Sequence, residues 1–161
     1  MPDTRDVIKR TVESILKADG WKKSGDSWYK KSTETLLAVC LQRSNHSKKY
    51  FLNLGIFLPL VDSVSTDFWL APISLRVDAL PNAKRFAPVN LFSLEFPMDE
   101  ADRQEKIQEL MEIVVLPEMN KCGTVEALKP NGAGQSLMEH VSLLRAEALF
   151  LRPGGNRPIP H

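Results

Sequence analysis

The residues best suited to chemistry lie between positions 42 and 55, and their types point to binding rather than to catalysis. Gln42 and Asn53 stand at nearly equal distances from a polar turn at residues 44–48, so we expect their amides to be near neighbours on paired strands. An amide carries two donors and an acceptor. The pair can therefore form a structural hydrogen bond or bind a ligand, and the sequence leaves both interpretations open.

A glycine and two arginines extend this polar region. Gly55 lies inside a predicted strand, where a glycine indicates a bulge, a tryptophan lying over the gap, or a ligand against the bare backbone. Arg43 and Arg76, together with Lys48 and Lys49, can add a basic rim, and a guanidinium is suited to planar recognition of a carboxylate or a phosphate. Tyr50, at the start of the predicted strand 50–58, adds an aromatic ring. The predicted binding residues are therefore Gln42, Arg43, Tyr50, Asn53, Gly55 and Arg76.

Signatures of catalysis and of metal binding are absent from the sequence. The histidines His46, His140 and His161 lie far apart, and no HExxH motif or His/Cys cluster offers metal-ligand spacing. There is no GxSxG motif, and nothing marks Cys40 or Cys122 as an activated nucleophile. We therefore predict no catalytic residue, no metal and no cofactor, and we favour a protein that is not an enzyme.

Composition indicates an ordinary soluble domain. The chain has 161 residues, of which 43% are hydrophobic and 25% are charged. Two distant cysteines favour a reducing compartment, the charged stretch Met1–Ala18 is unlike a signal peptide, and no apolar run is long enough to span a bilayer. We predict a cytoplasmic protein with a single domain over residues 1–151 and a flexible Pro/Gly-rich tail over residues 152–161.

The elements that must position the polar region begin with a helix. Apolar residues at helical spacing predict it over residues 5–18. Gly20 supplies the left-handed position that ends a helix, and Trp21 is placed to fold back onto its last turn as a core anchor.

Two long strands at residues 36–42 and 50–58, joined by the polar turn, form the centre of the predicted sheet. Side chains alternate between the two faces of a strand. One face of the second strand is apolar and is expected to face the core; it carries Tyr50, Leu52, Leu54, Ile56 and Leu58. The opposite face, which we name the mixed face, carries Phe51, Asn53, Gly55 and Phe57.

Three further strands are predicted. Residues 27–32 contain Trp28 and Tyr29 and lie between turn residues, whereas residues 73–80 alternate between apolar and polar side chains. A fifth strand is expected near residues 89–96, where prolines bracket the run.

Two helices are predicted after the strands. The first begins at Asp99, and Pro117 is expected to end it, to kink it, or to begin a short new segment. The second spans residues 134–151. The whole pattern predicts an α+β fold, in which an antiparallel meander of four or five strands carries an N-terminal helix and two C-terminal helices packed on one face.

Four short motifs follow one another within residues 16–58. They are Gly-Trp-Lys-Lys at 20–23, Trp-Tyr at 28–29, Leu-Gln-Arg-Ser at 41–44 and Tyr-Phe-Leu-Asn-Leu-Gly at 50–55. This series resembles the bacterial family known as domain of unknown function 4304, although Trp21 replaces a phenylalanine and Tyr50-Phe51 stand in swapped order. The resemblance implies no catalytic residues that can be carried over.

These observations favour a non-catalytic, cytoplasmic protein-binding domain, since arginine and aromatic residues anchor interfaces. A toxin domain is one candidate partner, and this chain would then be its immunity protein. This hypothesis rests on an analogy in size and style with the small domains that act as immunity proteins. Single-stranded nucleic acid is an alternative partner, because residues 1–50 carry 11 Lys or Arg against 6 Asp or Glu. An undetected hydrolase is the third interpretation.

Overall fold

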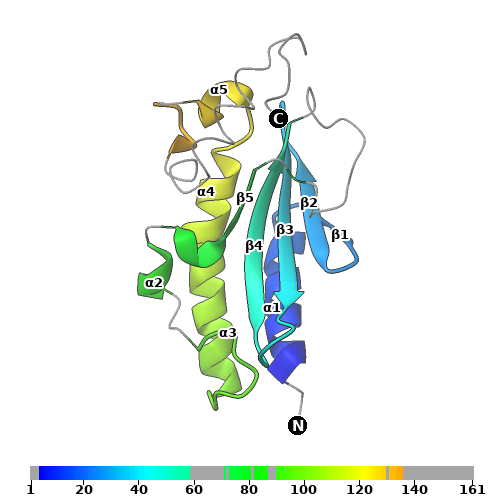
Figure 1. The fold of residues 1–161 in the computed structure, drawn as a ribbon, viewed down its shortest axis with the longest axis vertical. Helices are drawn as coiled ribbons and strands as arrows, with labels where there is room; N and C mark the ends of the chain where they lie inside the picture. The colour runs from blue at the N-terminus through cyan, green and yellow to red at the C-terminus, as the bar shows by residue number, and fades with distance from the viewer. Residues whose placement is uncertain are drawn as a thin grey trace.

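The chain forms a five-stranded antiparallel sheet with helices packed against one face, as Figure 1 shows. The structure is a computed structural model, and it describes residues 4–58, 71, 73–80, 82–86, 90–129 and 131–135. The strand order β1-β2-β3-β4-β5 follows the chain order, so the sheet is a meander and the predicted α+β class is confirmed. Most of the predicted helix 134–151 and all of the predicted tail 152–161 lie outside the described residues.

The bounds of the elements are as follows. The strands are β1 (Lys22–Ser24), β2 (Ser27–Lys31), β3 (Leu36–Arg43), β4 (Tyr50–Phe57) and β5 (Ile73–Arg76). The helices are α1 (Thr4–Ala18), α2 (Ala83–Phe86), α3 (Glu100–Glu109), α4 (Leu116–Asn120) and α5 (Val125–Leu128), together with a 3-10 turn, η2 (Val77–Ala79), and a π-helical segment, η3 (Leu110–Val115).

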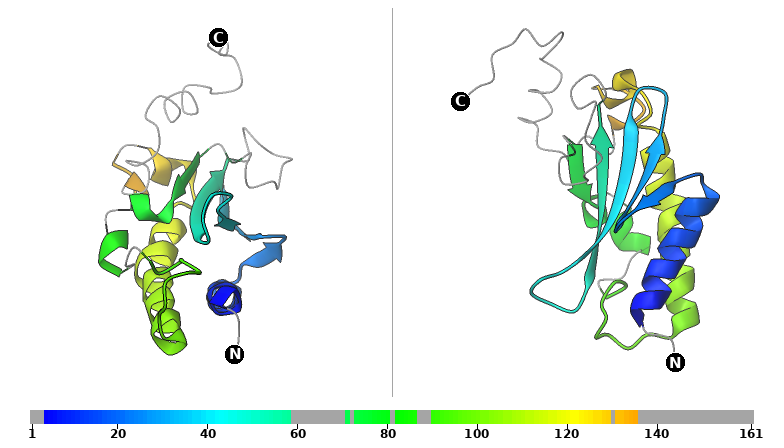
Figure 2. Two further views of the ribbon diagram at one scale, coloured as in Figure 1. Left: turned by 60° about the horizontal axis from the view of Figure 1, so that its bottom comes forward. Right: turned by 90° about the vertical axis from the view of Figure 1, so that its right-hand side faces the viewer.

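The central hairpin of β3 and β4 is the longest pairing in the sheet. The two strands pair over eight residues each, from Leu36 opposite Phe57 to Arg43 opposite Tyr50. The expected core face of β4 is buried against the helices. Figure 2 shows that α1 and α3 lie side by side on this face, which we name the helix-covered face. The predicted hairpin and its core face are therefore confirmed.

The mixed face is less open than the sequence suggested. Ala38, Cys40 and Phe57 are buried there and cluster with Ala71, and Gly55 is buried as well. At the other end of the hairpin, Gln42 and Phe51 are half-buried and Arg76 is exposed, while Ser74, opposite Gly55, is exposed nearer the buried cluster.

Two of the predicted strands differ from the structure. The predicted strand 73–80 ends at Arg76, where the chain turns into η2. The prediction of a strand near 89–96 was wrong for the described residues 90–96, which form turns and bends with a single bridge between Lys49 and Ser93. The fifth strand is instead β1, whose three residues are all exposed and therefore show no apolar alternation.

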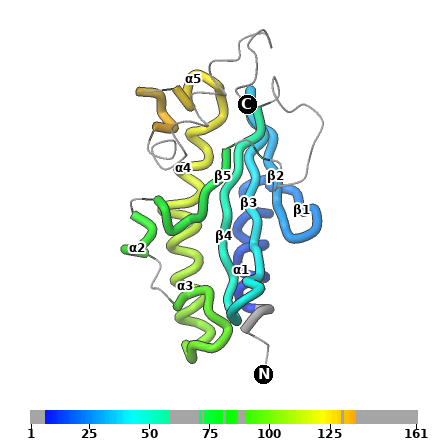
Figure 3. Tube along the Cα trace, in the orientation of Figure 1, coloured from blue at the N-terminus to red at the C-terminus, as the bar shows by residue number. Residues whose placement is uncertain are grey.

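The segment from α3 to α4 is one continuous helix with a π-helical middle, as the tube in Figure 3 shows. Asp99 caps its start as predicted, because its carboxylate accepts hydrogen bonds from the backbone N–H groups of Ala101 and Asp102. Pro117 lacks an N–H group and crowds the carbonyl four residues before it. The wider π turn accommodates the proline, since the N–H of Leu116 donates to the carbonyl of Met111, five residues earlier.

No helix among the described residues is long and apolar enough to cross a membrane.

The end of α1 follows the predicted stop signal. Gly20 has φ of +90°, the N–H of Trp21 donates to the carbonyl of Leu16 at 3.0 Å, and Trp21 is buried. With the bond from the N–H of Gly20 to the carbonyl of Lys17 at 3.1 Å, this forms a Schellman motif, in which a left-handed residue lets the chain fold back on the last helical turn.

Asp19, next to this stop, joins three parts of the chain. One oxygen of its carboxylate, Oδ2, accepts hydrogen bonds from the indole of Trp21 at 3.0 Å, from Lys30 of β2 at 3.1 Å and from Asn120 of α4 at 3.3 Å. Partial burial acts to raise the pKa of Asp19, but the three hydrogen bonds and the charge of Lys30 outweigh it, so the pKa lies below its ordinary value.

We expect Asp19→Asn to destabilise the protein by about 1 kcal/mol at pH 7, because a part-exposed charged hub contributes modestly. A carboxyl whose pKa is depressed by folding stabilises the native state above its unfolded pKa of about 3.9, and this contribution disappears as the pH falls through the folded pKa. Urea unfolding of both proteins from pH 7 to pH 2 measures this. The difference in free energy of unfolding between the two proteins must disappear below about pH 4. A difference that stays constant over the whole pH range would contradict the role given to Asp19.

Candidate binding site

The structure divides the six predicted binding residues between the two faces of the sheet. Strand alternation and burial place Gln42, Asn53, Gly55 and Arg76 on the mixed face and Arg43 and Tyr50 on the helix-covered face. Tyr50 is buried, and the amine of Lys9 on α1 lies 5.8 Å from its ring centroid. Arg43 is exposed at the end of β3. The predicted set therefore does not form one continuous surface.

The two amides form the expected pair. Asn53 Nδ2 donates to Gln42 Oε1 at 3.1 Å. The residues are diagonal neighbours, since Gln42 lies opposite Phe51 and Asn53 lies opposite Cys40. Asn53 is 6% exposed, so this bond satisfies one polar group of a buried amide. The structural interpretation accounts for the bond, and Gln42 remains half-buried beside the more open end of the mixed face.

Phe51 collects two cations at this end of the sheet. The guanidinium carbon of Arg76 lies 3.9 Å from the centroid of the Phe51 ring, and the amine of Lys49 lies 4.8 Å from it. A cation within about 6 Å of a ring face is attracted by the ring quadrupole. Arg76 and Lys49 therefore both lie beside the ring of Phe51 although both carry positive charge.

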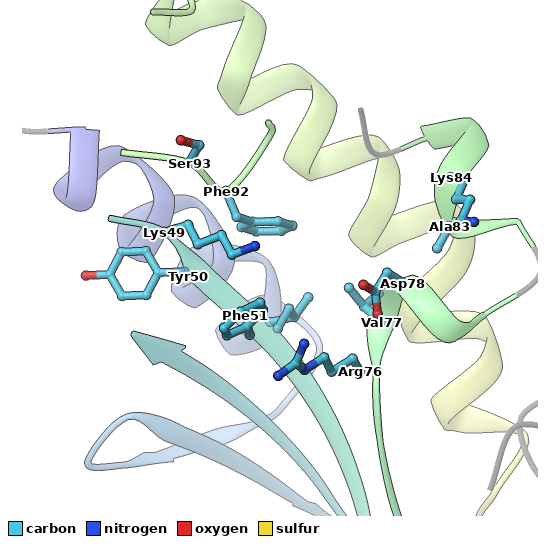
Figure 4. Close-up of a pocket in the computed structure, with 11 residues that line it drawn as sticks. Lys49, Tyr50, Phe51, Arg76, Val77, Asp78, Ala83, Lys84, Phe92 and Ser93 are labelled. Carbon is cyan, nitrogen blue, oxygen red and sulfur yellow. The ribbon is translucent and has the colours of Figure 1, made fainter. Parts of the chain in front are cut away.

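A pocket of about 420 Å³ opens beside this cluster, as Figure 4 shows. It lies where the neighbour of β4 changes: β5 pairs with β4 only from Asn53 to Ile56, whereas the start of β4 bonds to the segment at residues 92–94. Its walls come from β4, the end of β5, η2, α2 and this segment; they are formed by Lys49, Tyr50, Phe51, Leu52, Arg76, Val77, Asp78, Ala83, Lys84, Phe92 and Ser93.

The lining has an apolar floor and a positively charged rim. Leu52, Val77 and Ala83 are buried, whereas three lining cations and one lining carboxylate are exposed; these charged residues are Lys49, Arg76, Lys84 and Asp78. Within the described part of the chain, the ion pairs at 4.0 Å or less involve other residues. The site is therefore suited to an anion that also carries an apolar group.

Of the lining residues, Tyr50 and Arg76 belong to the predicted binding set and Lys49 to the predicted basic rim. Figure 4 shows the ring of Tyr50 turned away from Arg76, so Arg76 and Lys49 are the predicted residues whose charged groups reach this site. The missed residues lie in β4, just after β5, in α2 and at residues 92–93, and one signal in the sequence pointed to the last of these places. Arg103 stands four residues before Ile107, on the apolar stripe of α3, where a charge needs an explanation.

Arg103 fixes one wall of the pocket. It is 1% exposed, and its guanidinium donates to the carbonyls of four residues, which are Asn90, Leu91, Ser93 and Phe96. Burial lowers the pKa of Arg103, but arginine remains protonated at neutral pH. These bonds curl residues 90–96 over the N-terminal end of α3. The N–H of Tyr50 then donates to the carbonyl of Phe92 at 2.9 Å. Arg103 thereby positions Phe92 and Ser93.

The other chemically active side chains do not join this site. Burial and the nearby charge of Glu118 raise the pKa of the Cys122 thiol to about 12, so it stays protonated at neutral pH. Cys40 is buried on the mixed face, and His46 is exposed in the turn after β3, while His140 and His161 lie outside the described residues. Among the residues that the structure describes, no three His, Cys, Asp or Glu side chains come together in a way that would hold a metal ion.

Comparison with known proteins places the chain in a family. The family described as domain of unknown function (DUF4304) matches residues 12–121, which run from α1 to the end of α4. The chain belongs to this family. The match extends well beyond the motifs at residues 16–58 and includes both Arg103 and the pocket lining. Neither the comparison with curated proteins nor the comparison with solved structures gives a match.

We expect Arg103→Met to lower the free energy of unfolding by about 3 kcal/mol, because it leaves several carbonyls without a donor. Hydrogen exchange of the Tyr50 and Leu94 amides should also accelerate, since the first bonds β4 to the 90–96 segment and the second bonds that segment to Lys48, just before β4. Urea denaturation and exchange measured by NMR test this. Arg10→Met, at an exposed site on α1, is the matched control and should change stability by no more than about 0.5 kcal/mol. An equal effect of both substitutions would contradict the role of Arg103.

Proposed function

We propose that this member of the DUF4304 family is a non-catalytic protein-binding domain, and that it anchors its partner at the pocket and the adjoining end of the mixed face. The observation that carries the proposal is the arrangement around Phe51, where Arg76 and Lys49 gather beside an apolar hollow. Arginine and aromatic residues are enriched among the residues that contribute most to interface affinity. A pocket at a sheet edge gives a partner side chain a place to insert.

The partner class that we propose is a toxin domain, with this chain as its immunity protein. The size of the domain and its charge pattern support this proposal, and the comparison is with small immunity domains in general. The surplus of positive charge at the pocket suits the acidic groups of a partner, and complementary charge accelerates association.

Single-stranded nucleic acid is the second candidate, favoured by the rings of Phe51 and Phe92 beside lysine and arginine. Against it, Arg76 lies over the face of Phe51 on which a base would stack. Residues 99–161 also carry 10 Asp or Glu against 7 Lys or Arg, so the positive charge does not extend over the chain. A protein partner is therefore the leading proposal.

We expect the chain to copurify with the protein encoded by the reading frame immediately upstream of its own, and we expect Arg76→Glu to weaken that complex at least about tenfold. Titration calorimetry on the purified pair measures the affinity. Arg10→Glu, which reverses an exposed charge on α1, is the control and should bind like the wild type. Both variants should melt near the wild-type temperature, because both side chains are exposed.

Two results would overturn the proposal. One is a complex that Arg76→Glu and Arg10→Glu weaken equally. The other is filter binding of an oligothymidine with a steep salt dependence in the absence of any protein partner, since that would establish the second candidate.

A further inference from the structure

We infer that the pocket binds a carboxylate carried on an apolar group, and that the partner supplies it as an aspartate or glutamate side chain next to an aromatic or aliphatic residue. This inference rests on the proposed function and names the group that the partner must present.

The charges around the pocket select an anion. Lys49, Arg76 and Lys84 line it together with a single carboxylate, that of Asp78. The guanidinium carbon of Arg76 lies 3.9 Å from the centroid of the Phe51 ring, and a cation–π contact of this kind uses none of the N–H groups as hydrogen-bond donors. A planar fork of N–H groups matches the two oxygens of a carboxylate. Arg76 is therefore the main contact for the ligand.

Asp78 lowers the positive charge of the lining. It follows the end of β5 at Arg76 by two residues and lines the same pocket as the three cations, so three positive charges and one negative charge leave a sum of +2. A carboxylate brings one negative charge and leaves +1, whereas a phosphate group with close to two negative charges would bring the sum near zero. The choice of a carboxylate therefore follows from the proposed protein partner, because aspartate and glutamate are ordinary side chains and a phosphate group on a protein requires a modification.

The floor of the pocket selects an apolar neighbour for that carboxylate. Leu52, Val77 and Ala83 are buried beneath it, and the ring of Phe92 points into it in Figure 4. A volume of about 420 Å³ exceeds that of a carboxylate alone and lies in the range of sites for small organic groups. The remaining space would take an aromatic ring or a branched aliphatic side chain.

A small probe tests this chemistry without a protein partner. We would titrate the ¹⁵N-labelled protein with 3-phenylpropionate and follow the backbone amide signals. The signals of Phe51, Leu52, Val77 and Ser93 should shift together, because these residues line the pocket. The neutral isostere 3-phenylpropionamide should bind about tenfold more weakly, since it lacks the charge that Arg76 recognises.

Matched variants separate the pocket from a general effect of charge. Arg76→Gln should weaken 3-phenylpropionate about tenfold, and Lys84→Gln about threefold, whereas Arg10→Gln should leave the affinity unchanged. Arg76 and Lys84 are exposed, so the variants are expected to fold; each spectrum confirms this directly.

Several outcomes would overturn the inference. They are equal binding of the acid and the amide, tighter binding of phenyl phosphate than of 3-phenylpropionate, shifts confined to residues outside the pocket, and equal weakening by Arg76→Gln and Arg10→Gln. If the upstream protein binds but the acid does not, the inference fails and the proposed function stands. If the acid binds and no protein partner does, the proposed function fails and the pocket chemistry stands.

Discussion

A single buried guanidinium shapes the edge of this sheet. Arg103 reaches from α3 to the carbonyls of a segment that has no ladder of its own, and it satisfies groups that would otherwise be buried without a donor. A buried charge is costly unless its hydrogen bonds are made, and four acceptors meet that need here. Among the described residues no carboxylate forms an ion pair with Arg103. The backbone of residues 90–96 therefore depends on this residue for its shape.

The pocket is a consequence of that shape. A meander would normally continue the ladder along the whole of β4, but β5 is four residues long and turns away at Val77. The curled segment then takes its place, through the bonds of Tyr50 to Phe92 and of Leu94 to Lys48. The two neighbours of β4 do not meet, so Phe51 and Leu52 lie at a break in the edge. The hollow lies there because of topology, and its lining comes from four runs of the chain, at residues 49–52, 76–78, 83–84 and 92–93.

Local patterns were enough to predict the hairpin, the end of α1 and the amide pair. Alternation fixed the faces of β4, the Gly20-Trp21 pair marked the helix end, and counting from the turn brought Gln42 near Asn53. The same logic failed where a distant residue decides the structure. Residues 90–96 are rich in apolar residues like a strand, but Arg103 takes their carbonyls, and β1 lacks any apolar signal because all its residues are exposed. The pocket was missed for the same reason, since its walls are set by these long-range contacts.

The position of Arg76 and Lys49 is difficult to explain by stability alone. Two like charges beside one ring repel each other, and the attraction of each to the ring face is small where water has access. Exposed lysines and arginines often cover apolar surface with their stems, and that accounts for contact with Phe51. It does not account for a third cation, Lys84, brought to the same hollow by a separate element. Cations that line one concave site from the residue before β4, from β5 and from α2 raise the local potential there, because low-dielectric walls focus the field. A bound anion lowers this repulsion, so the arrangement is better matched to a liganded state than to an empty one.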